Sequence, residues 1–105
     1  MYVQWHSDGT ELTNSSRPPV TSSFCMGVWE KTGPSTYRLN HVAMSWNPDS
    51  TFLGPASIRM EVTVDRGGNK YTGTFTIVQY DASGMNVLVP TPIVGVVTAT
   101  RITVD

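Results

Sequence analysis

The chain has little charge, a single cysteine and no long apolar run. Its 7 basic residues are balanced by 8 acidic ones, so the sequence predicts no basic surface for nucleic acid. No apolar stretch approaches the ~18 residues of a membrane-spanning helix. Cys25 is the one cysteine, which excludes an internal disulfide. With 39% hydrophobic residues over 105 positions, the composition predicts one globular domain, residues 1–105.

Motifs for metals and organic cofactors are also missing. The two histidines, His6 and His41, stand in no HxH or HExxH pattern, and no CxxC pair is present. No glycine-rich phosphate loop lies between a strand and a helix. We therefore expect neither a metal site nor a cofactor.

Helical periodicity is absent as well, and strand-forming residues alternate with turn-forming ones. Short loops between successive strands predict an antiparallel up-and-down meander. Closing that meander into a small calycin-like barrel of about seven or eight strands would remove its exposed edges, and a sandwich is the alternative. In strand 52–64, Pro55 restricts pairing, so its regular part is expected to begin at Ala56. The expected strands are residues 2–6, 10–14, 24–30, 36–46, 52–64, 70–80, 85–89 and 93–104.

Strand 36–46 carries candidate site residues on both faces. One face holds Tyr37, Leu39, His41, Ala43 and Ser45. The other holds Arg38, Asn40, Val42, Met44 and Trp46. Composition does not decide which face looks inward. The first is favoured, since a polar row among apolar walls is the usual form of a small-molecule site.

Cys25 and His41 are the available thiol and imidazole for covalent catalysis. Pairing of the two strands about Gly33 would place them opposite each other. A buried thiol beside a hydrogen-bonded imidazole is the favoured reading of that pair.

Several segments resemble a family of small calycin-like β-barrel proteins of bacteria, which are often exported. The resemblance rests on Gly27-Val28-Trp29, Thr32-Gly33-Pro34, Tyr71-Thr72-Gly73-Thr74-Phe75 and Ala99-Thr100-Arg101-Ile102. It implies a lipocalin-like or allene-oxide-cyclase-like barrel with an internal cavity. The start, MYVQWHSDG, lacks the layout of a signal peptide.

Such proteins also carry an upstream strand with a Gly-x-Trp motif, which this chain lacks. A barrel without that strand has an open seam, and a second subunit could fill it. The resemblance therefore implies a homodimer.

These features lead to three functional hypotheses. The first is binding of a small hydrophobic or aromatic molecule, with a site made of Cys25, Trp29, Tyr37, His41, Met44 and Trp46. The alternative is a cofactor-independent enzyme in the same cavity, a cyclase, isomerase or simple hydrolase with His41 and Tyr37 as its acid–base groups. A third is a fully packed structural barrel.

Overall fold

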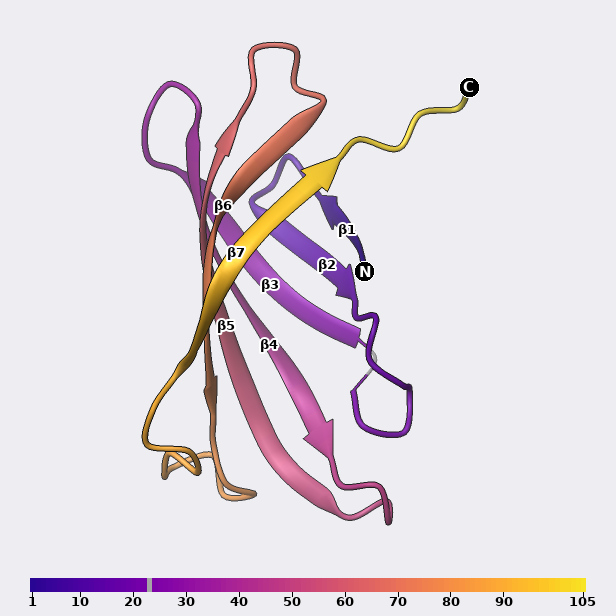
Figure 1. Ribbon diagram of the computed structural model, residues 1–105, viewed down its shortest axis with the longest axis vertical. Helices are drawn as coiled ribbons and strands as arrows, with labels where there is room; N and C mark the ends of the chain where they lie inside the picture. Colours follow the sequence, from indigo (N-terminus) through magenta and orange to yellow (C-terminus); the bar gives the residue numbers. More distant parts are fainter. Residues whose placement is uncertain (23) are drawn as a thin grey trace.

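The computed structural model describes residues 1–22 and 24–105 and contains one seven-stranded antiparallel sheet. Each strand pairs with the next strand along the chain, as the short loops predict (Figure 1). The all-β class and the up-and-down meander are therefore confirmed. The strands are β1 (Tyr2–Trp5), β2 (Thr10–Asn14), β3 (Phe24–Lys31), β4 (Thr36–Trp46), β5 (Phe52–Val64), β6 (Lys70–Gln79) and β7 (Ile93–Thr100).

Aspartate-centred turns connect several of these strands. Between β1 and β2, the Asp8 carboxylate accepts hydrogen bonds from the backbone N–H and the hydroxyl of Thr10, and Gly9 takes a φ of 88°. Between β5 and β6, the Asp65 carboxylate accepts from the backbone N–H groups of Asn69 and Lys70. Such turns reverse the chain within a few residues, which is why neighbouring strands are also consecutive in sequence.

The sheet curls into a half-barrel (Figure 1), a shape compatible with a small barrel. Among the described residues no ladder joins β1 to β7, so each strand lies at an edge. We call the side of the sheet that carries the hydrophobic core the inner face, and the opposite side the outer face. The core consists of Leu39, Met60, Val62 and Val97, with Trp5, Trp29, Tyr37, Ile58, Tyr71 and Phe75 packed against it.

Strand β5 begins at Phe52, but its fully regular pairing begins at Ala56, as predicted. The ladder with β6 starts at the Ala56–Gln79 pair, and the ladder with β4 shifts its register before Gly54. Pro55 lies opposite Met44 in the β4–β5 ladder, and its carbonyl accepts from the backbone N–H of Tyr80. The N–H and C=O of one strand residue point to the same side of the strand, so the position of the missing Pro55 N–H also faces Tyr80. The Gln79 side-chain amide donates to the Tyr80 carbonyl instead, at 2.9 Å. The β4–β5 ladder therefore continues past the proline.

Two strand predictions are corrected near the C-terminal end. Residues 85–89 form no strand and contribute an isolated bridge, between Tyr80 and Val87, because the chain from Asp81 to Asn86 is held in a turn. The last strand ends at Thr100 rather than residue 104. Thr100 pairs with Lys70, the first residue of β6, so the sheet offers no neighbour beyond that point.

Candidate ligand groove and buried Glu11–His41 pair

The favoured inner face of β4 is the one observed. Leu39, His41, Ala43 and Ser45 are buried, and Tyr37 is half-buried. Met44 and Trp46 lie on the outer face, with 62% and 37% of their surface exposed. The structure therefore separates them from the other expected ligand-binding residues, because successive side chains of a strand point to opposite faces.

His41 forms a buried pair with Glu11, a residue that the sequence did not single out. The imidazole Nδ1 lies 2.6 Å from Glu11 Oε1, and the two residues are 3% and 1% exposed. The hydroxyl of Thr13 donates to the same carboxylate oxygen at 3.2 Å. With Glu11 ionised, Nδ1–H is the donor in this pair.

Gly27 makes the Glu11–His41 contact possible. Glu11 on β2 and His41 on β4 both pair with Gly27, which lies on the strand between them. Strands two apart are separated by about 10 Å, so the two side chains must cross the intervening strand. A Cβ at position 27 would collide with the Cβ and Cα of His41. The absence of a side chain there gives the carboxylate and the imidazole room to meet.

The predicted pairing of Cys25 with His41 is wrong. Cys25 pairs with Ala43, and the residue opposite His41 is Gly27. The reversal is centred one residue beyond Gly33, which moves every pair of the ladder by two positions. Cys25 remains on the inner face, two residues from Gly27 along β3.

The Cys25 thiol is buried and kept in its neutral form. Burial, and after it the negative charge of Glu11, raise the pKa of the thiol above its ordinary value of 9.0. The thiolate is the reactive form of cysteine, so this environment suppresses nucleophilic chemistry. The geometry favours the reading of Cys25 as a packed side chain.

Four aromatic side chains gather at one end of the inner face. Trp5 stacks on Trp29 with ring centroids 5.7 Å apart, and on Tyr71 at 5.5 Å. Tyr37 lies 5.4 Å from the Trp5 ring and 5.7 Å from the Trp29 ring. These separations fall in the range of favourable aromatic contacts.

The aromatic cluster lines an open groove of about 830 Å³. The groove lies where the curled sheet brings its two edge strands toward each other, so residues of both β1 and β7 line it (Figure 1). Its walls include Trp5, Trp29, Tyr37, Tyr71, Val97 and Ala99. This volume is within the ~300–1,000 Å³ of small-molecule sites.

The two indole N–H groups of the cluster differ in their partners. Trp29 Nε1 donates to the backbone carbonyl of His6 at 3.0 Å. Trp5 Nε1 is buried and has no hydrogen-bond partner within the described residues. A buried donor without an acceptor is unfavourable, so the position of the Trp5 indole carries a cost in stability.

Glu11 connects the buried pair electrostatically to the groove. Burial, and then the charge of Glu11, raise the pKa of the Tyr71 phenol above its ordinary value of 10.0. Trp5 is the direct cross-strand partner of Glu11 on the other side. Glu11 and the aromatic cluster therefore lie next to each other on the inner face.

The structure does not bring His41 and Tyr37 together as an acid–base pair. They share a face of β4 but are four residues apart, which corresponds to about 13 Å along a strand. Tyr37 lines the aromatic groove, whereas His41 pairs with Gly27 and contacts Glu11. Within residues 1–22 and 24–105, no group of three or more His, Cys, Asp or Glu side chains is placed to hold a metal ion.

No family model, curated protein or solved structure was found to match this chain. The resemblance to calycin-like proteins therefore stays a prediction. No helix in the described part of the chain could span a membrane.

Proposed function

We propose that the half-barrel binds a small hydrophobic or aromatic molecule in its groove. The observation that carries the proposal is the aromatic wall of Trp5, Trp29, Tyr37 and Tyr71 around an open volume of about 830 Å³. Aromatic rings give a planar ligand large contact area and preferred stacking geometry.

The residues of the proposed ligand site are not all the ones expected from the sequence. Trp29 and Tyr37 remain, and Trp5 and Tyr71 join them. His41 and Cys25 are buried elsewhere on the inner face. Met44 and Trp46 are excluded because they lie on the outer face.

Titration with the neutral fluorescent probe N-phenyl-1-naphthylamine tests this proposal. Ala99 lines the groove, so Ala99→Trp should fill it and weaken probe binding by about tenfold or more. Val96→Trp is the matched control, because Val96 is on the same strand but exposed on the outer face. Equal affinity in both variants, or no binding to the wild type, would contradict the proposal.

A second candidate function is cofactor-independent acid–base catalysis, and the Glu11–His41 contact of 2.6 Å favours it. A carboxylate that accepts from Nδ1–H leaves Nε2 of a neutral imidazole able to take a proton. Turnover that is lost in His41→Gln, with probe affinity retained, would favour this candidate over simple binding.

We also propose that the chain is a homodimer. The unpaired edges of β1 and β7 support this, since open edges favour pairing with another chain. Neither edge strand, β1 or β7, contains a charged residue or a proline that would discourage such pairing. Sedimentation equilibrium of the purified chain measures the subunit number, and a monomer at micromolar concentration would contradict the proposal.

A further inference from the structure

The aromatic groove carries charges of one sign. Among the described residues that line it, the charged ones are Lys70 and Arg101, and both are basic. The whole chain has a net charge of -1, so this local excess of positive charge does not follow from composition. A cleft lined by one sign of charge attracts ligands of the opposite sign.

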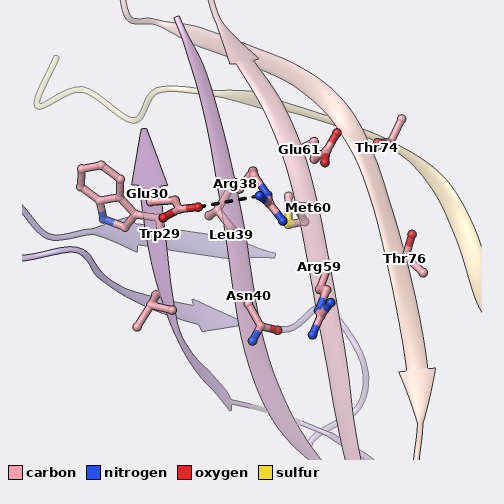
Figure 2. A pocket seen from close by; sticks show the side chains of 11 residues that line it. Trp29, Glu30, Arg38, Leu39, Asn40, Arg59, Met60, Glu61, Thr74 and Thr76 are labelled. Carbon is pink, nitrogen blue, oxygen red and sulfur yellow. Dashed lines mark ion pairs between the residues drawn. The ribbon is translucent and has the colours of Figure 1, made fainter. Parts of the chain in front are cut away.

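A hollow on the outer face shows the contrast. It has a volume of about 870 Å³ and is lined by two arginines and two glutamates, Arg38, Arg59, Glu30 and Glu61 (Figure 2). Arg38 Nη1 lies 3.9 Å from Glu30 Oε1, the contact marked by the dashed line in the same view. The two signs offset each other there, so the positive excess belongs to the groove rather than to the sheet as a whole.

The strand register brings Arg101 to the groove. Its backbone N–H donates to the Asn69 carbonyl at 2.7 Å, which continues the β6–β7 pairing one residue beyond the end of β7. Ala99 pairs with Tyr71 and lines the groove, and Arg101 follows two positions later on the same side of the chain. Lys70 precedes Tyr71, so its side chain points to the other face and adds charge at the rim.

The Arg101 guanidinium is available to a ligand. It takes part in no ion pair within residues 1–22 and 24–105. Glu11, the buried carboxylate of the inner face, is 1% exposed and does not line the groove. Its Oε1 accepts from the Thr13 hydroxyl and lies 2.6 Å from His41 Nδ1. An anion in the groove therefore meets Arg101 without a competing carboxylate in the groove wall.

A further cation lies against the aromatic cluster. Lys31 is the cross-strand partner of Tyr37, and its Nζ lies 6.0 Å from the centroid of the Tyr37 ring. A cation held at the face of an aromatic ring keeps its positive charge beside that ring. The cluster is therefore flanked by Lys31 on β3 and by Arg101 after β7.

We propose that the groove selects amphipathic anions, which combine a planar apolar body with one oxyanion group, as an aromatic acid does. The inference rests on the proposed binding function and adds a ligand class to it. The rings of Trp5, Trp29, Tyr37 and Tyr71 hold the apolar body, and the Arg101 guanidinium donates to the oxyanion. Arginine suits this role because its planar fork of N–H donors matches carboxylate and phosphate oxygens and stays charged.

Two probes that share a ring system test the inference. Anilinonaphthalene sulfonate carries one sulfonate on the scaffold of the neutral N-phenyl-1-naphthylamine. A groove that offers apolar contact alone should favour the neutral probe, because a charged group is costly to remove from water. We expect the wild type to bind the sulfonate about tenfold more tightly, which is the scale of a hydrogen bond to a charged group. Added salt should reduce this preference.

Matched arginine variants of the full chain locate the preference. Arg101→Gln should remove most of it and keep the fold, since Arg101 is exposed and lies beyond the last strand. Arg59→Gln is the control, because it removes an equal charge from the outer face. The readout is the ratio of the two probe affinities, which a general loss of binding leaves unchanged. Competition by naphthoate and by naphthyl phosphate then distinguishes a carboxylate ligand from a phosphate.

The outcomes separate the ligand class from the binding function itself. A preference for the sulfonate that is lost in Arg101→Gln and kept in Arg59→Gln supports the inference. Equal or weaker binding of the sulfonate to the wild type overturns the inference and leaves a groove for neutral molecules. A preference that the two variants change equally also overturns it. Failure of both probes to bind overturns the inference and the proposed function together.

Discussion

His41 and Glu11 make a buried contact of 2.6 Å although their strands are not neighbours. Strand β3 runs between them, and the contact exists because Gly27 offers no side chain at the crossing point. The polar centre of the inner face thus depends on one glycine. The aromatic groove lies beside it. Burial, and then the negative charge of Glu11, raise the pKa of Tyr71 in its wall.

Gly27→Ala should destabilise the fold by about 3 kcal/mol, since overpacking of a filled interior has this scale. The added methyl group would collide with the backbone and the Cβ of His41, which cannot swing away. Gly67→Ala is the matched control, because its new Cβ would approach the end of the flexible Asn69 side chain. Urea unfolding of both variants measures the difference, and equal stabilities would contradict the crossing geometry.

Glu11→Gln should lower the free energy of unfolding by about 3 kcal/mol, because breaking a buried pair leaves its partner uncompensated. Glu30→Gln should cost about 0.5 kcal/mol or less, since the Glu30–Arg38 pair is exposed on the surface. Replacing both Glu11 and His41 by leucine should cost less than the sum of the single replacements. Additive losses in this double-mutant cycle would show that the two residues do not act as a pair.

Cys25 should react slowly with a thiol reagent such as dithionitrobenzoate in the folded protein at pH 7, and rapidly in urea. Because its pKa is raised in the folded state, the linked stability is complete at lower pH and declines as the pH rises past 9.0 toward the folded-state pKa. Cys25→Ala should lack this decline below the titration of Tyr71, whose ordinary pKa is 10.0. Fast labelling of the native thiol would contradict its burial.

Trp29→Phe should destabilise the protein by about 1 kcal/mol more than Trp5→Phe. Both changes shorten a ring of the same cluster, but the Trp29 N–H gives up a hydrogen bond to His6. The Trp5 N–H has no such bond to lose. Thermal unfolding without added ligand checks the order of the two variants, and the reverse order would show that the Trp29 hydrogen bond does not stabilise the cluster.

The fold could be predicted where short-range patterns decide it. Ile58, Met60 and Val62 alternate with polar residues along β5, and this period of two indicates a strand with one buried face. The Asp8-Gly9 turn likewise predicts the first hairpin. The ends of the strands depend on neighbours instead, as the limit of β7 at Thr100 shows.

The site was harder to predict because it depends on register. In β2 the apolar residue is Leu12, so alternation alone points Leu12 inward, yet Glu11 and Thr13 are the buried residues. The pairing register is needed to show that Glu11 has a partner, because Glu11 and His41 both pair with Gly27. Trp46 shows the opposite case. A large aromatic residue suggests an inner position, but Trp46 lies on the outer face.

The most direct measurement is a proton–nitrogen correlation spectrum of the three indole N–H groups during titration with N-phenyl-1-naphthylamine. Trp5 and Trp29 line the groove, whereas Trp46 lies on the outer face and serves as an internal control. The account predicts that the Trp5 and Trp29 signals shift with a common dissociation constant and that the Trp46 signal stays in place. A shift of Trp46 alone, or no shift at all, would contradict binding in the groove.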